Sequence, residues 1–206
     1  MAATASPYGF KAVNELGGLP YAGSTRSFLI DPAGYNTNIY NGTIVYVNSS
    51  GYLNIVTGTG ADGTTNSFPG SGTLTGAVGV FVGCTYINAQ GQVIYAQYYP
   101  ANTTGVVSAY VIDDDRAVFQ VQANGTVAQS ALGDNVYLAN AQSTSTGSTT
   151  TGNSNIAVSS TVITTTAAFR IVGFVNSTTS QVGDAYTDLL VKFNPGYHSY
   201  SNAVGV

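Results

Sequence analysis

Ten short segments rich in Val, Ile, Tyr, Phe and Thr follow one another along this chain, and turn-forming residues bound each of them. Branched and aromatic residues favour strands, and strands spaced about 10–15 residues apart are typical of a sandwich or a barrel. The segments are TRSFLI, TIVYVN, GYLNIVT, GAVGVFVGCTYI, QVIYAQYY, VVSAYVID, AVFQVQA, NVYLA, FRIVGFV and DLLVKFN. We therefore predict an all-β fold of about ten short strands.

Two features refine that prediction. Helical character is confined to residues 126–132, which predict a short helix ending at Gly133, and to a turn that includes Arg116. At most one or two short helices are therefore expected. The apolar run GVFVGCTYI is nearly continuous, so it is expected in the middle of a sheet with both faces covered.

The 206 residues fit a single domain with extended ends. Gly and Pro punctuate residues 1–25 too often for a regular element, so this segment is expected to be an extended N-terminal arm that packs on a neighbour or frays. Residues 26–194 form the predicted β-rich core, with surface loops at 58–76 and 141–155. Residues 195–206 are predicted to be a C-terminal tail of the same kind as the arm.

Charged residues make up only 7% of the chain, against about 25% in an average soluble domain. The 5 Lys and Arg residues are too few to neutralise nucleic-acid phosphates or to form a basic membrane-binding helix. With 44% hydrophobic residues the chain can nevertheless build a core. Its surface is predicted to be uncharged, with many of its 15 Tyr residues available for contacts with other proteins.

Residue types that support export or cross-linking are also sparse. No basic and apolar leader opens the sequence, glycine interrupts the longest apolar run, and Cys84 is the only cysteine. These features predict synthesis in a cytoplasm, no membrane span and no intrachain disulfide.

Candidates for catalysis are few. His198 is the only histidine and lies in the predicted tail, where an interface or solvent position is expected rather than acid–base chemistry. Cys84 lies in an apolar run, which is typical of an inert buried thiol. The run Asp113–Asp115 could ligate a hard cation, but we favour a loop in which these carboxylates cap backbone N–H groups beside Arg116.

Four other carboxylates, Asp31, Asp134, Asp184 and Asp188, could supply a glycosidase-type pair, but no motif singles out two of them. No glycine motif for phosphate binding opens a helix. We therefore expect a protein that is not an enzyme and that holds no cofactor and no metal ion.

Several stretches together resemble a known family. They are SPYGFKAVNELGGLPYAGSTRSF, GVFVGCTYINAQGQVIYAQYYPA, AYVIDDDRAVFQVQANG, FRIVGFV and DAYTDLLVKFN. In these stretches the chain is similar to small proteins encoded in the head modules of tailed bacteriophages, including cyanophages, that are taken to be capsid decoration, or cement, proteins. The resemblance runs from Ser6 to about Asn194, with 141–155 as the variable part.

The resemblance implies a virion protein on the outer capsid surface, made in the host cytoplasm, that bridges neighbouring major capsid proteins. We expect a homo-oligomer and favour a trimer, because capsids offer threefold positions. Neither nucleic acid nor a membrane is expected as a partner. The residues expected at the capsid or subunit interface belong to the arm, the start of the core and the tail: Tyr8, Phe10, Lys11, Leu16, Leu19, Tyr21, Arg26, Tyr197, His198 and Tyr200.

Two other functions stay open at this point. Exposed Tyr, Asn and Asp residues would also suit a receptor- or carbohydrate-binding module of a phage tail or fibre. A hydrolase would use a pair of Asp residues, or Asp113–Asp115 with a metal ion.

Overall fold

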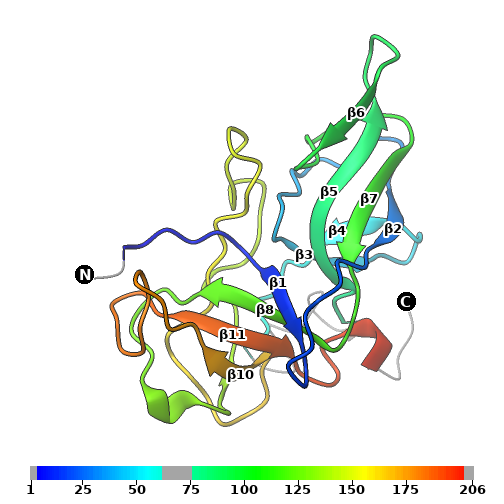
Figure 1. Ribbon diagram of the computed structural model, residues 1–206. Coiled ribbons are helices and arrows are strands. Elements are labelled where there is room, and N and C mark those ends of the chain that lie inside the picture. The colour runs from blue at the N-terminus through cyan, green and yellow to red at the C-terminus, as the bar shows by residue number, and fades with distance from the viewer. Residues whose placement is uncertain (1–3, 62–75, 202–206) are drawn as a thin grey trace.

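The chain folds into two antiparallel sheets that pack together, as the computed structural model shows for residues 4–61 and 76–201 (Figure 1). In spatial order, sheet 1 contains β1 (Lys11–Glu15), β8 (Ala117–Gln122), β11 (Asp188–Phe193), β10 (Phe169–Phe174) and β9 (Asn135–Val136). Sheet 2 contains β2 (Arg26–Ile30), β7 (Val107–Ile112), β5 (Gly79–Ile87), β3 (Ile44–Val47) and β4 (Leu53–Ile55), and β6 (Val93–Ala96) pairs with the end of β5. The predicted all-β class is confirmed, and the ten predicted segments become β2 to β11.

The predicted helix at 126–132 is wrong in extent. Within the described ranges the helical elements are two 3₁₀ turns, η1 (Gln129–Ala131) and η2 (Ser199–Ser201). The Val127 N–H donates to the Thr187 hydroxyl at 3.1 Å, and Ala128 has an extended backbone, so no helix can start before Gln129. The predicted turn that includes Arg116 is present after β7, and there the Asp114 carboxylate accepts a hydrogen bond from the Arg116 N–H at 2.8 Å.

Strand β1 lies inside the segment expected to be an arm. It pairs antiparallel with β8, so that Lys11 faces Gln120 and Glu15 faces Ala117. Just before it, the Phe10 side chain is buried in the core. The expectation that residues 1–25 form an extended arm that packs on a neighbour or frays is therefore corrected for residues 10–15, because a partner strand about 100 residues away supplies the backbone hydrogen bonds that this short segment cannot make alone.

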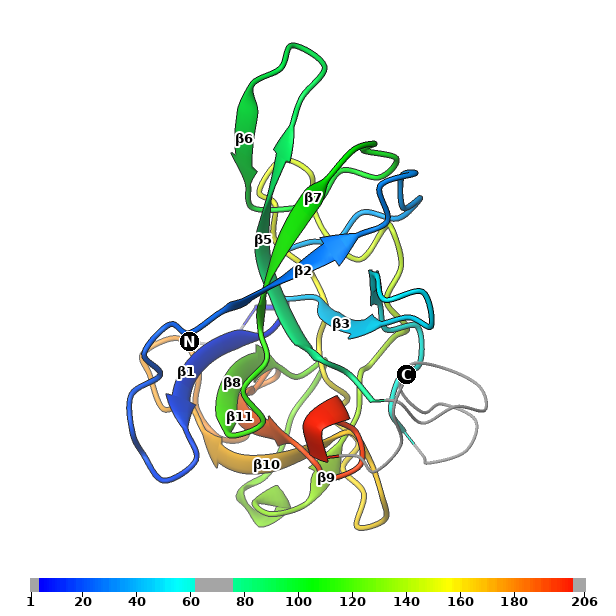
Figure 2. The same cartoon turned by 90° about the vertical axis from the view of Figure 1, so that its right-hand side faces the viewer.

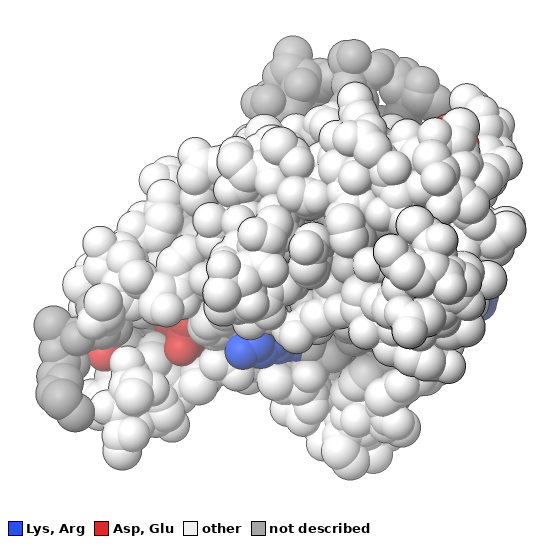
Figure 3. Space-filling model, turned by 90° about the horizontal axis from the view of Figure 1, so that it is seen from above, with Lys and Arg blue, Asp and Glu red and all other residues white. Residues whose placement is uncertain are grey.

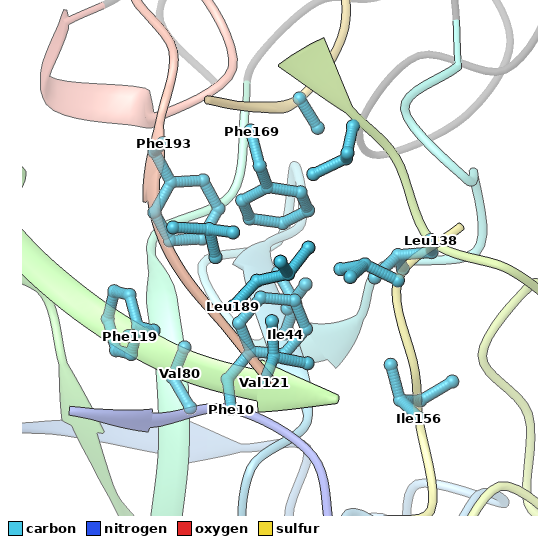
Figure 4. Packing of buried hydrophobic residues seen from close by; sticks show 14 of the residues in the cluster. Phe10, Ile44, Val80, Phe119, Val121, Leu138, Ile156, Phe169, Leu189 and Phe193 are labelled. Atoms are coloured by element: carbon cyan, nitrogen blue, oxygen red, sulfur yellow. The ribbon is translucent and has the colours of Figure 1, made fainter. Parts of the chain in front are cut away.

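The larger hydrophobic core lies between the two sheets and is centred on four phenylalanines (Figure 4). The Phe10 ring lies 4.9 Å from that of Phe169, which lies 4.9 Å from that of Phe193, and Phe119 meets Phe10 and Phe193 edge-on. Aromatic pairs at such distances add about 0.5–1.5 kcal/mol each beyond the burial of their area. This cluster joins the N-terminal segment to strands from the middle and the end of the chain.

A second core covers the opposite face of sheet 2. It contains Phe81, Val111 and Tyr99, all fully buried. The Tyr99 hydroxyl accepts from the Tyr35 N–H at 3.0 Å and lies 3.1 Å from the Thr103 carbonyl oxygen. The polar end of this buried ring is thus satisfied, and it fixes the loops that follow β2 and β6.

Strand β5 passes from a covered to an uncovered part of sheet 2. Its residues from Gly79 to Phe81 are buried on both faces, whereas Thr85 and Tyr86 are half-buried and Ile87 is exposed. The prediction that this run is central is confirmed by its pairing with β7 on one side and with β3 and β6 on the other, but the prediction that both faces are covered is wrong beyond Cys84. Sheet 1 does not extend over that end of the strand.

The predicted loop at 141–155 is a loop, and hydrogen bonds from its buried Gln142 attach it to the rest of the fold. Gln142 is buried, and its carboxamide accepts from the Ile44 N–H at 2.8 Å and donates to the carbonyls of Ile44 and Val56 at 2.9 and 2.8 Å. This side chain takes the place of a neighbouring strand. Most of the predicted loop at 58–76 lies outside the described residues.

Candidate interaction surface

Two connections cross from one sheet to the other side by side. Residues 16–25 link β1 to β2, and residues 113–116 link β7 to β8 (Figure 2). The Leu16 N–H donates to the Arg116 carbonyl at 2.8 Å, and the Arg116 guanidinium donates back to the Leu16 carbonyl at 3.4 Å. We call residues 16–26, 113–116 and 197–201 the seam, since together they lie where the two sheets meet.

A charged and aromatic triad closes the seam at the start of β2. The Arg26 Nε lies 2.8 Å from Asp113 Oδ2, and its Nη1 donates to the Tyr200 hydroxyl at 2.9 Å. That hydroxyl donates to the same Asp113 oxygen at 3.0 Å, and the guanidinium lies 5.2 Å from the Tyr200 ring centroid. Burial, followed by the hydrogen bond to Asp113, raises the pKa of Tyr200. The triad anchors the C-terminal segment while half of the Tyr200 ring stays exposed.

The two residues that precede η2 point inward. Tyr197 and His198 are buried, and the His198 ring lies 5.4 Å from that of Phe193. Burial lowers the pKa of His198, although the negative charges of Asp115, Asp113 and Asp114 oppose this effect. The expectation that Tyr197 and His198 contact a partner is corrected. Main-chain bonds between Ala77 and both Tyr197 and Ser199 hold the tail against the body and turn these side chains into the core.

The N-terminal candidates lie along sheet 1. The Tyr8 hydroxyl donates to Asp188 Oδ1 at 3.1 Å, and the Lys11 ammonium lies 4.4 Å from the centre of the Tyr8 ring. Burial, and then the negative charge of Asp188, raises the pKa of Tyr8. Tyr8 is half-buried, Lys11 is exposed, and Phe10 belongs to the core and is closed to any partner.

Three of the residues expected at an interface lie in the connection between β1 and β2. Leu16 and Leu19 are exposed, and Tyr21 is half-buried with its hydroxyl bonded to the Ser24 carbonyl. Burial raises the pKa of Tyr21, with help from the carboxylates of Asp114 and Asp113. Together with Tyr200, these residues give the seam exposed apolar side chains beside the exposed charged residues Arg26, Asp115 and Arg116.

Among the candidate catalytic groups, Asp113–Asp115 lie close enough to His198 for their charges to act on its pKa, but His198 is buried. Asp113 pairs with Arg26 and Asp114 caps a backbone N–H, while Cys84 is buried with its pKa raised to about 12 by that burial. Across residues 4–61 and 76–201, no group of three or more His, Cys, Asp and Glu side chains is placed to hold a metal ion.

A small uncharged groove lies beside the N-terminal segment. It has a volume of about 190 Å³, and its lining includes Asn124, Asn140, Asn155 and Tyr186. Typical ligand pockets have volumes of about 300–1,000 Å³. The groove has room for one small polar group of a ligand.

Sequence reasoning missed a second exposed surface, on sheet 2. Five large apolar side chains are exposed there, namely Leu29, Ile87, Val93, Tyr95 and Val106. The alternation in QVIYAQYY and VVSAYVID indicates one outward face for each strand, but only the register across strands shows that these faces coincide.

The accessible surface carries little charge. Seen from the end of the molecule at which the β5–β6 hairpin projects, the blue and red atoms form a few separate spots on an otherwise uncharged face (Figure 3). No helix among the described residues is long and apolar enough to cross a membrane.

Comparisons of the chain with protein-family models, with curated proteins and with solved structures gave no match, so its function has to be inferred from its own surfaces.

Proposed function

We propose that this chain is a non-enzymatic structural protein of a phage particle, which binds the outside of the capsid and joins neighbouring major capsid proteins. The observation that carries the proposal is the combination of two properties of the surface. Nine large hydrophobic side chains among the described residues are exposed, while only 7% of all residues are charged. Exposed apolar side chains that are not singly scattered mark sites of protein–protein contact.

The seam has the features of a surface that docks on protein. Burying one leucine side chain contributes about 1.5–3 kcal/mol, and Leu16 and Leu19 expose much of their area beside the half-exposed Tyr200. Arg26 is already paired with Asp113, so docking would not leave it as an isolated buried charge. The seam is therefore the proposed contact with the shell.

The test uses particles from a phage whose gene for this chain has been deleted. The purified chain is added to these shells, and the bound fraction is measured by co-sedimentation. We expect saturable binding at a fixed ratio to the major capsid protein. Absence of the chain from wild-type particles, or failure to bind the deleted shells, would contradict the proposal.

Point substitutions locate the contact better than truncation, because deleting residues 1–25 would also remove Phe10 and β1 from the core. The double variant Leu16→Asp, Leu19→Asp should bind shells at least tenfold more weakly. Leu132→Asp is the matched control, since Leu132 is equally exposed but follows η1, outside the seam. Equal binding by the double variant and the control would exclude the seam as the contact.

A receptor- or carbohydrate-binding module is the second candidate, and one observation favours it. The groove beside the N-terminal segment is lined by Asn side chains and Tyr186, whose polar groups suit a hydroxyl group of a bound sugar. Copy number separates the two functions, because a shell protein is present in hundreds of copies per particle and a tail protein in a handful. Quantitative mass spectrometry of purified particles measures it.

A further inference from the structure

The exposed apolar residues of sheet 2 stand in register on one face. Leu29 of β2 is paired with Ser108 of β7, Ser108 with Thr85 of β5, and Thr85 with Tyr95 of β6. Residues that are directly opposite in neighbouring strands project to the same side of a sheet. One row of side chains therefore crosses four strands on the same face.

The next row extends this face toward the tip of the β5–β6 hairpin. Ile87 is paired with Val93, and Val106 lies two residues before Ser108, so all three project to the same side. Val106 is 71% exposed, Ile87 60% and Tyr95 80%. We call this surface the outer face of sheet 2: Leu29, Ile87, Val93, Tyr95 and Val106, with Thr85, Ser108 and Tyr110 between them.

The same face is already used for packing at its other end. Ile44, Val80 and Ile112 project to this side of sheet 2 and are buried in the core against sheet 1. Sheet 1 ends there, and in both views the β5–β6 hairpin projects beyond it (Figures 1 and 2). The exposed rows thus continue an apolar face for which the described residues supply no cover.

The polar groups on this face are compatible with burial. The hydroxyls of Thr85 and Tyr110 lie 3.0 Å apart and bond to one another, so both keep a partner when water leaves. No strand residue on this face is charged. In a two-fold contact each patch meets its own copy, and a face without charge meets itself without repulsion.

The extent of the face also fits a dimer. Four strands about 4.8 Å apart and roughly six residues long cover about 400 Å² in projection. That is about half of the roughly 800 Å² per partner that standard stable interfaces bury, which is the size of a weak contact that dissociates on dilution.

We propose that two copies of this chain pack through the outer face of sheet 2, sheet against sheet about 10 Å apart, around a two-fold axis. Such a contact forms a dimer, in place of the trimer that the sequence analysis favours. The inference does not rest on the proposed attachment to a shell, because self-association belongs to the purified chain alone.

The experiment is sedimentation velocity on the full chain over a hundredfold range of concentration. The expected result is a species of two chains that dissociates on dilution. Tyr95→Asp on β6 and Val106→Asp before β7 should each weaken the dimer at least tenfold, while Leu132→Asp should leave it unchanged. Circular dichroism checks that the variants are folded, and Tyr95→Ser repeats the test without introducing a charge.

Three results would overturn the proposal. The first is a monomer at every concentration, and the second is a trimer. The third is a dimer that withstands Val106→Asp, since a contact made by the hairpin alone would be weakened only by the substitutions at Tyr95.

Discussion

The two ends of sheet 2 use the same face in opposite ways. At one end, Ile44, Val80 and Ile112 are buried beneath sheet 1 and the N-terminal segment. At the other end, Leu29, Val106 and Tyr95 project from the same side of the same strands into solvent. The residue types are alike, so the difference lies in what the rest of the chain places above them. An apolar strand face becomes core only where another layer reaches it.

The strongest test of this comparison removes part of the covering layer. Phe10→Ala should lower the free energy of unfolding by about 3–5 kcal/mol, because the Phe10 ring packs on Phe169 and Phe119. Leu19→Ala, in the same terminal region but exposed, should change it by no more than about 0.5 kcal/mol. Urea denaturation measures both values. A loss below 1 kcal/mol for Phe10→Ala would show that the N-terminal segment is dispensable as a cover.

Substitution of the buried Gln142 should cause the second-largest loss of stability. Gln142→Leu removes three hydrogen bonds and leaves the Ile44 N–H and the Val56 carbonyl without that partner, so we expect a loss of about 2–4 kcal/mol. Gln90→Leu in the exposed β5–β6 turn is the control and should cost little. Thermal and urea unfolding of the two variants would separate them, and equal stability would refute the role given to Gln142.

The pH dependence of stability tests the inward placement of His198. Burial lowers its pKa in the folded chain below the ordinary value of 6.5, so the unfolded chain binds the proton more readily. Stability is therefore complete above pH 6.5 and falls as the pH drops below that value. His198→Asn should remove this loss over the same pH range.

Titration of Asp188 changes the stability in the opposite sense, at more acidic pH. Burial raises its pKa despite the hydrogen bond from Tyr8, so the folded chain binds that proton more readily and gains stability as the carboxyl protonates. The difference between wild type and His198→Asn isolates the histidine. An identical pH profile for the two proteins would mean that His198 is accessible to water.

The smallest change in stability is expected for a substitution at the uncovered end of sheet 2. Tyr95→Ser should change the free energy of unfolding by no more than about 0.5 kcal/mol when measured at concentrations at which the chain is monomeric. A loss above 1 kcal/mol under those conditions would show that part of this chain already covers Tyr95.

Sequence patterns predicted the fold class and the positions of ten strands, because β-branched and aromatic segments between turn residues depend mainly on local preferences. They missed β1, since Lys11 and Glu15 at its ends and the glycines around it resemble a loop. That strand exists through its pairing with β8, which no local pattern records.

The candidate surface was predicted less completely. Leu16, Leu19, Arg26 and Tyr200 are exposed as expected, but Phe10, Tyr197 and His198 are buried. Spaced aromatic residues in a glycine-rich segment fit either a docking arm or a strap over the chain's own core, and only long-range contacts decide between the two. Nothing in the Ser- and Thr-rich sequence around Gln142 indicates that this side chain is buried.

The pairing of β1 with β8 also bears on how the chain is made. Residues 11–15 leave the ribosome about 100 residues before their partner at 117–122, and β11 at 188–193 must still join β8 on its other edge. At about 5–20 residues per second, the first strand waits on the order of 5–20 s for a partner. The low charge of the sequence leaves the nascent chain little repulsion against early aggregation, so its yield should depend on chaperones.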